Sequence, residues 1–158
     1  MKFTYCDTNS KAVSNDINLL FPGFGKDEVL VVMSPHDDDA VIGAGYAMLA
    51  AKEAGVEEIL LLERDSATGG ILQQCIHNGF GLHRFKEELT GPEYADVYLA
   101  EVEKRGIKVY TETTVTSVAP DRVVTARNRE GILKIKAGAV VRSMGCRERS
   151  RGALNISG

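Results

Sequence analysis

Residues 29–63 contain two sets of side chains that could carry chemistry. His36, Asp38 and Asp39 form the first set and directly follow a run of apolar residues. Imidazole and carboxylate groups bind zinc, and two ligands three positions apart can face one ion where a strand gives way to a helix. A carboxylate beside the metal can then take a proton from bound water. The alternative is a polar helix start, with acidic residues near the positive end of the helix dipole.

The second set is Gly43, Gly45 and Glu63. A Gly-x-Gly pair with an acidic residue twenty positions after its first glycine is the outline of a dinucleotide-binding fingerprint. In that pattern the carboxylate accepts hydrogen bonds from ribose hydroxyls. Glycines also permit close packing inside a helix, and the spacing to Glu63 arises in any strand–helix–strand unit. The two interpretations exclude each other, because the zinc motif and the dinucleotide-binding fingerprint assign the first strand to different residues.

Two buried strands and the helix between them would position these residues. Residues 29–33 and 59–62 are continuous apolar runs, typical of strands buried on both faces. The spacing of apolar residues favours a helix over 38–54, ended by Gly55, rather than a short strand at 40–42. This interpretation predicts that the two strands are parallel in one sheet.

The rest of the chain predicts further elements in a regular order. A glycine-rich loop at 64–81 leads to two helices and then to short β-branched segments with a period of two. The predicted fold class is α/β: a Rossmann-like three-layer domain with a parallel sheet and a small antiparallel β meander. Residues 1–28 are expected to form an N-terminal extension, and residues 29–158 a single Rossmann-like domain that is incomplete. The predicted helices are 83–89 and 92–105, and the predicted strands are 107–110, 113–118, 122–126, 132–136 and 139–141.

Composition limits the partners and the location. The chain of 158 residues has a formal net charge of −3, which gives no reason to expect nucleic acid or an anionic membrane as a partner. No apolar run approaches the ~20 residues of a membrane span, and the first residues lack the apolar centre of a signal peptide. A cytoplasmic location is therefore expected. The three cysteines are scattered and indicate neither a disulfide framework nor a cysteine-rich zinc module.

Residues 29–52 resemble the start of the PIG-L/LmbE-type zinc deacetylases. The resemblance is carried by the motif Pro-His-x-Asp-Asp after a buried strand. It implies that His36 and Asp39 bind zinc and that Asp38 is the general base. The family pattern needs a third ligand, a distant histidine, and this chain contains only two histidines beyond residue 52. Catalytic zinc usually has three protein ligands, so deacetylase turnover is expected to be absent.

Residues 53–158 resemble the N-terminal part of FAD/NAD(P)-dependent oxidoreductases of the pyridine nucleotide-disulfide type. The stretches that carry this resemblance are LLLERDSATGGILQQCIHNGFGLHRFKEELTGPEYA and AGAVVRSMGCRERSRGALNISG. The resemblance implies that Glu63 holds the adenosine ribose and that Gly69 and Gly70 lie near the cofactor. It also implies that Gly145 approaches the flavin nucleotide.

The two resemblances meet near residue 52, so the chain is expected to be a fusion or a truncated reading frame. The first-ranked function is the FAD-binding segment of a flavin-dependent oxidoreductase, inactive alone, with a small-molecule substrate or another oxidoreductase subunit as partner. The alternatives are a fragment of a zinc-dependent deacetylase, with zinc as cofactor, and a non-catalytic remnant or interaction module. The aspartates at 37–39 would repel a pyrophosphate, so FAD retention is expected to be weak. Affinity should depend on Glu63 more than on Gly43.

Overall fold

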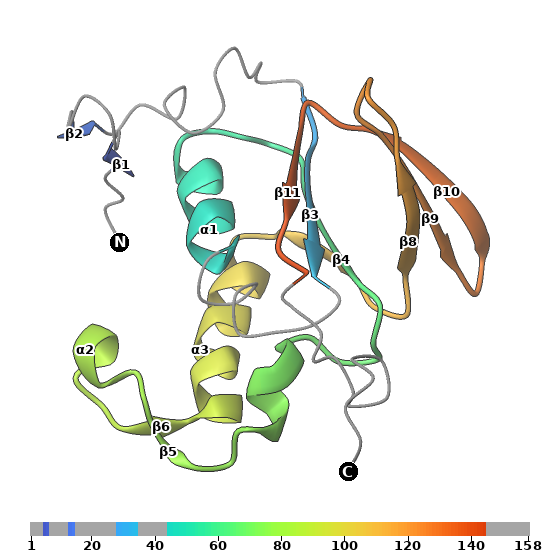
Figure 1. The fold of residues 1–158 in the computed structure, drawn as a ribbon. Helices are drawn as coiled ribbons and strands as arrows, with labels where there is room; N and C mark the ends of the chain where they lie inside the picture. The colour runs from blue at the N-terminus through green and yellow to red at the C-terminus, as the bar shows by residue number, and fades with distance from the viewer. Residues whose placement is uncertain (1–4, 7–12, 15–27, 35–43, 145–158) are drawn as a thin grey trace, which may run out of the picture.

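A four-stranded parallel sheet forms the centre of the fold (Figure 1). The computed structural model describes residues 5–6, 13–14, 28–34 and 44–144. The strand order is β11–β3–β4–β7, and every neighbouring pair is parallel. The predicted parallel pairing of the two buried strands is confirmed, and the last strand pairs with β3 in the same sheet. The strands are β3 (Leu30–Ser34), β4 (Ile59–Glu63), β7 (Lys108–Tyr110) and β11 (Ala139–Arg142).

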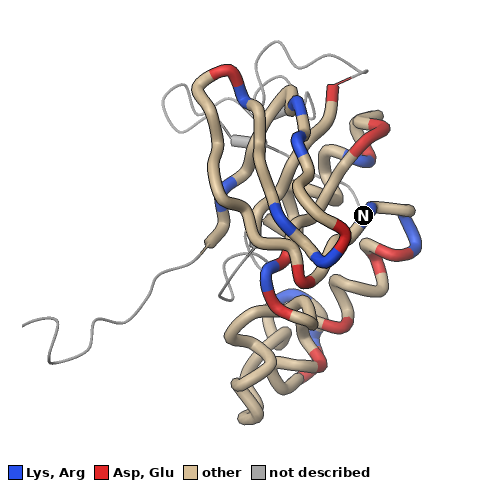
Figure 2. The backbone as a smooth tube through the Cα atoms, turned by 90° about the vertical axis from the view of Figure 1, so that its right-hand side faces the viewer, with Lys and Arg blue, Asp and Glu red and all other residues tan. Residues whose placement is uncertain are grey.

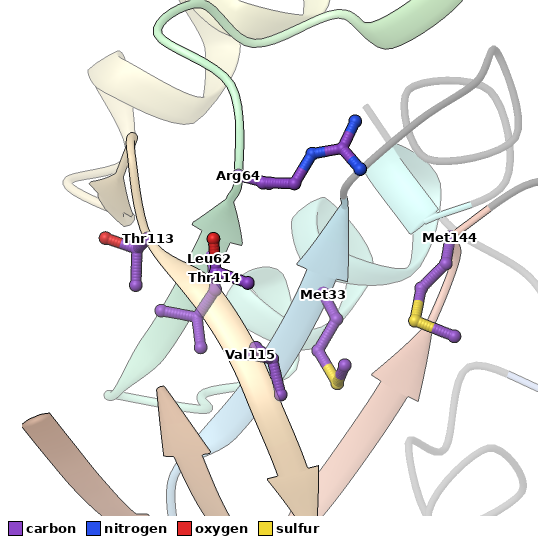
Figure 3. Close-up of a pocket in the computed structure, with 7 residues that line it drawn as sticks. All are labelled: Met33, Leu62, Arg64, Thr113, Thr114, Val115 and Met144. Atoms are coloured by element: carbon purple, nitrogen blue, oxygen red, sulfur yellow. The ribbon is translucent and has the colours of Figure 1, made fainter. Parts of the chain in front are cut away.

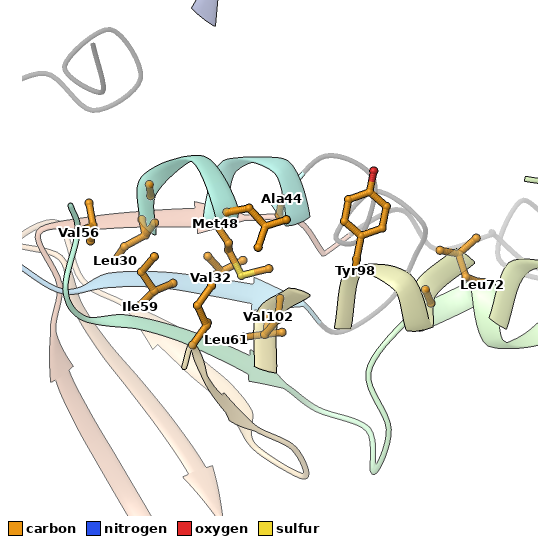
Figure 4. Close-up of a cluster of buried hydrophobic side chains, with 14 of the residues drawn as sticks. Leu30, Val32, Ala44, Met48, Val56, Ile59, Leu61, Leu72, Tyr98 and Val102 are labelled. Atoms are coloured by element: carbon orange, nitrogen blue, oxygen red, sulfur yellow. The ribbon is translucent and has the colours of Figure 1, made fainter. Parts of the chain in front are cut away.

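Two helices, α1 (Gly45–Glu53) and α3 (Gly91–Lys104), cover one face of this sheet. Helix α1 confirms residues 45–53 of the predicted helix, and residues 38–43 of that prediction lie outside the described part of the chain. The helices are held by an apolar core that they share with the sheet (Figure 4). The core includes Leu30, Val32, Met48, Leu49, Ile59, Leu61, Tyr98 and Val102, all at most 5% exposed.

A three-stranded antiparallel meander covers the opposite face and completes the three layers. Its strands are β8 (Thr114–Val118), β9 (Val123–Asn128) and β10 (Gly131–Lys136). The predicted period of two is visible in β10, where Leu133 and Ile135 pack inward and Lys134 and Lys136 are exposed. Basic residues recur along the strands of the meander (Figure 2). The second core joins the inner side of the meander to the sheet through Val31, Met33, Leu60, Leu62, Val124 and Ala126.

The chain between β4 and α3 differs most from the prediction. The segment predicted as loop contains the 3-10 helix η3 (Gly70–Gln74) and the short strand β5 (Asn78–Phe80). The helix predicted at 83–89 is wrong at its end, because α2 spans only Leu82–Phe85 and β6 (Leu89–Thr90) pairs with β5. Tertiary contacts hold this segment: the Phe85 ring centroid lies 5.5 Å from that of Tyr94 and 5.8 Å from that of Tyr98.

Several predicted site residues lie outside the described part of the chain: His36, Asp38, Asp39, Gly43 and Gly145. Within residues 1–28, the structure describes one short antiparallel pair, β1 (Tyr5–Cys6) and β2 (Val13–Ser14). Among the described residues, every helix is too short or too polar to cross a bilayer.

Candidate functional site

The parallel strands bring their carboxyl ends to one edge of the sheet. Ser34, the last residue of β3, lies opposite Glu63, the last residue of β4. Strand β11 ends beside them at Arg142, whose neighbour in the register is Met33. Ligands of open α/β sheets bind in the crevice outside these carboxyl ends. A binding site is therefore expected at this edge of the described structure.

Glu63 is the buried charged residue at this edge. It is 1% exposed, at the end of a strand whose other residues are all apolar. Its Oε1 accepts a hydrogen bond of 2.9 Å from the Asp65 backbone N–H. Burying a carboxylate is unfavourable unless hydrogen-bond donors surround it. The end of β4 therefore carries a strong hydrogen-bond acceptor that is shielded from solvent.

The side chain of Glu63 belongs to the helical side of the sheet. Leu61 packs into the core shared with the helices, and Leu62 packs into the core shared with the meander. Side chains alternate along a strand, so Glu63 follows Leu61 toward the layer that contains α1. Gly45, the predicted fingerprint glycine, is the first residue of α1 and is buried. The amino end of α1 and the carboxylate therefore belong to the same side of the sheet.

A cavity of about 220 Å³ lies on the other side of the edge, between the sheet and the meander (Figure 3). Small-molecule pockets usually measure about 300–1,000 Å³, so this cavity suits one ring system of a larger ligand. Its lining comes from the carboxyl ends of β3 and β4, the start of β8 and the residues after β11. The lining residues are Met33, Leu62, Arg64, Thr113, Thr114, Val115 and Met144.

Most of the lining is apolar, and Arg64 supplies its charge. The side chain of Arg64 extends from the end of β4 toward the end of β3 (Figure 3). Its Nε lies 3.2 Å from the Asp65 carboxylate, and both side chains are about half exposed. A planar guanidinium can stack on an aromatic ring, and methionine sulfur makes favourable contacts with such rings. The cavity is thus chemically suited to a flat heterocycle.

Gly69 and Gly70 lie at the start of η3, where their backbone conformation is demanding. Gly69 has a φ of 109°, and an added Cβ would lie 2.8 Å from Nε2 of Gln73 and 3.2 Å from the Cβ of Ala95. The glycine therefore lets η3 pack closely on α3. A cofactor contact at these glycines stays a prediction.

The two remaining histidines do not form a zinc site in the described residues. Nδ1 of His77 lies 3.0 Å from the Asn78 carbonyl oxygen, and its ring packs 5.4 Å from that of Phe80. His83 is exposed in α2. Among described residues, no three His, Cys, Asp or Glu side chains are grouped so that they could hold a metal ion. The residues of the deacetylase motif itself lie in the part of the chain that is not described.

Sequence reasoning missed most of the cavity. Arg64 adjoins the predicted Glu63 and could have been considered with it. Thr113 and Thr114 carry no local signal, because they reach the cavity only through the pairing of distant strands.

Comparisons with known proteins support the fold assignment. No protein-family model and no curated protein sequence matches this chain. Among solved structures, L-proline dehydrogenase from P. horikoshii is similar with a TM-score of 0.56 and 20% identity, over 75% of this chain and 23% of that one. The atypical thioredoxin reductase TRi from Desulfovibrio vulgaris Hildenborough has a TM-score of 0.54 and 16% identity, over 79% and 38% of the two chains. Bacillithiol disulfide reductase from Staphylococcus aureus has a TM-score of 0.50 and 18% identity, over 87% and 34%.

These likenesses define a fold. At such identities they establish that the chain is Rossmann-like, with a parallel sheet, helices on one face and a separate small antiparallel sheet. The chain spans between 23 and 38% of the length of these three proteins.

Proposed function

We propose that this chain is the dinucleotide-binding part of a flavin-dependent oxidoreductase, and that its carboxyl edge binds the adenosine half of FAD. Three kinds of support agree. The residues from 53 onward resemble that family, the fold is Rossmann-like, and the similar solved structures are a dehydrogenase and two reductases. FAD supplies the redox chemistry when bound, and this chain supplies the binding groups.

Glu63 is the observation that carries the proposal. An ionised carboxylate accepts hydrogen bonds only, and the two hydroxyls of a ribose are donors that match it. Glu63 stands at the carboxyl end of the second strand of the βαβ unit, where the dinucleotide fold binds its ribose. Hydrogen bonds to a charged group contribute about 1.5–3 kcal/mol each. Glu63 therefore fits the role of ribose acceptor.

The residues around Glu63 fit the rest of the adenosine half. The cavity on the meander side has the size and the apolar lining for a purine ring, with the Arg64 guanidinium beside it. The amino end of α1 belongs to the opposite side of the sheet, and a helix amino end attracts phosphate. A ligand crossing the edge would thus meet base, ribose and phosphate sites in order.

The experiment is calorimetric titration of ADP and of adenosine into the wild-type protein and into Glu63→Gln. Loss of the charged acceptor should raise the Kd about tenfold or more, because 1.4 kcal/mol corresponds to a factor of ten. Glu58→Gln is the matched control, since Glu58 is exposed at the amino end of the same strand and pairs with Lys108 at 3.0 Å. Its Kd should equal that of the wild type.

Two comparisons sharpen this test. Gly43→Ala should weaken ADP binding less than Glu63→Gln does, as the sequence predicts. Adenosine should bind about as well as ADP if the aspartates at 37–39 repel phosphate. Equal affinity of the wild type and Glu63→Gln would remove Glu63 from the site. No binding of either ligand by the wild type would contradict the proposed function.

A further inference from the structure

Two methionines face the cavity proposed for the base. Met33 comes from β3 and is 5% exposed. Met144 lies two residues beyond β11, is partly exposed and packs against the same apolar core. The side chains of both line the cavity, beside the ends of β3 and β11 (Figure 3). The two side chains therefore differ in access to solvent while sharing one wall.

Two hydrogen bonds from Ser143 fix the backbone next to Met144. The backbone N–H and the hydroxyl of Ser143 both donate hydrogen bonds of 3.1 Å to the Met33 carbonyl oxygen. These bonds continue the parallel pairing of β11 with β3 by one residue beyond the strand end. Because Ser143 is tied to Met33, the thioether of the next residue is held at the rim of the cavity.

We propose that Met144 is a modification site, at which oxidation by a hydroperoxide weakens binding of the purine base. This inference rests on the proposed function. In the reaction the peroxide O–O bond breaks and one oxygen forms the S–O bond of the sulfoxide. When the oxidant is hydrogen peroxide, the other oxygen leaves as water. The thioether is oxidised by two electrons and the peroxide is reduced by two. The peroxide should oxidise Met144 in preference to Met33, because Met33 is more deeply buried.

The sulfoxide changes the chemistry of the cavity wall. A soft apolar thioether becomes a polar, chiral group that disrupts apolar contacts. The favourable contact of sulfur with an aromatic ring is lost, and the new S=O dipole stands in a cavity lining that includes the apolar side chains of Leu62 and Val115. A polar group placed against such a surface is unfavourable unless a donor reaches it. A bound purine would have to desolvate that dipole, so its affinity falls.

The experiment uses graded hydrogen peroxide, followed by dithiothreitol, which reverses sulfenic acid and disulfide formation but not sulfoxide formation. Peptide mass spectrometry measures sulfoxide at each methionine, and calorimetry measures ADP affinity before and after treatment. Met144 should be oxidised before Met33 and before Met48, which is 3% exposed in the other core. The Kd for ADP of the wild type should rise at least fivefold, and methionine sulfoxide reductases should restore it.

Each variant is compared with itself before and after oxidation. The ratio of the two Kd values should be near one for Met144→Leu and should equal the wild-type ratio for Met48→Leu. Resistance of Met144 to peroxide, or full ADP affinity with Met144 oxidised, would overturn the inference and leave the proposed function intact. Absence of ADP binding before any oxidation would overturn both.

Discussion

Thr113 donates a backbone hydrogen bond of 2.8 Å to the carbonyl oxygen of Glu63. This bond joins the entry of the meander to the end of β4, so two layers of the fold meet at the candidate ribose acceptor. Thr114 and Val115 follow directly and line the cavity. The geometry of the proposed site therefore depends on how the chain enters β8 as well as on the sheet.

The Thr113 side chain should stabilise this junction. It is 1% exposed, and its Oγ1 donates a hydrogen bond of 2.8 Å to the Thr111 carbonyl. Thr113→Val keeps the shape and removes the donor, and should lower the free energy of unfolding by about 1 kcal/mol in urea titration. The control is Thr116→Val, an exposed site in β8, where a change within about 0.5 kcal/mol is expected. Because the Thr116 hydroxyl also donates a hydrogen bond, of 3.2 Å to the Thr125 carbonyl oxygen, equal effects at both sites would show that burial adds nothing to the Thr113 bond.

Gly91→Ala should disrupt the packing of α3 on η3. An added Cβ would lie 2.3 Å from the Leu72 carbonyl oxygen and 2.7 Å from atoms of Cys75, and backbone atoms cannot move away cheaply. We expect a loss of about 3 kcal/mol or more in denaturant unfolding.

Gly55→Ala is the comparison for Gly91→Ala. Gly55 has a φ of 96° but open space around it, so its substitution tests strain without a clash. A loss of about 1–2 kcal/mol is expected there. A smaller loss at Gly91 than at Gly55 would refute the proposed clash.

Tyr98 should make the protein sensitive to alkali. Burial, together with the hydroxyl of Tyr94 at 3.4 Å, raises the pKa of Tyr98 above its ordinary value of about 10. The folded protein keeps this proton at a pH where the unfolded chain loses it, so stability falls as the pH rises above about 10. Thermal unfolding between about pH 9 and 11 should show a smaller loss for Tyr98→Phe than for wild type. Tyr110→Phe, at a 38% exposed site, should behave like wild type.

Glu93 should make the start of α3 sensitive to acid. Its Oε2 accepts hydrogen bonds from the Thr90 backbone N–H at 2.8 Å and from the Thr90 hydroxyl at 2.7 Å. These bonds, the backbone one first, lower the pKa of the Glu93 carboxyl. The stabilisation is present above the usual carboxyl pKa of about 4.3 and is lost as the pH falls below it.

The test compares thermal unfolding of the wild type and Glu93→Gln at about pH 7 and about pH 3. The wild type should be the more stable at neutral pH, and the difference should shrink in acid. Thr90→Ala removes one of the two donors. At neutral pH its thermal stability should therefore lie closer to that of the wild type than the stability of Glu93→Gln does. A difference between wild type and Glu93→Gln that is the same at both pH values would contradict the assignment.

The regular elements were predictable because each has its own period. The apolar runs at 29–33 and 59–62 indicate buried parallel strands, and the structure pairs them. The alternation from 113 onward indicates the meander, since one side of each strand is solvated. In these segments local pattern and tertiary burial agree, which is why sequence alone sufficed.

The segment between β4 and α3 could not be predicted for the opposite reason. Helix α2 has only four residues, too few for a helical period. Gly69, Gly79 and Gly81 adopt positive φ values, so the chain turns where no local preference specifies the direction. Aromatic contacts of Phe80 and Phe85 with α3 decide its course. The cavity escaped prediction likewise, because the order of the strands brings Met144 to Met33.

The pairing of β11 with β3 also governs how the protein is made. During ribosomal synthesis Leu30–Ser34 precedes its partner Ala139–Arg142, which is translated only after the helices and the whole meander. Until then one edge of β3, which is apolar from Leu30 to Met33, lacks its partner, and such edges recruit other chains. Long-range parallel pairing is also intrinsically slow. The interval between translation of these two strands is therefore a period in which the unpaired edge exposes the nascent chain to aggregation, and in which a chaperone would protect it.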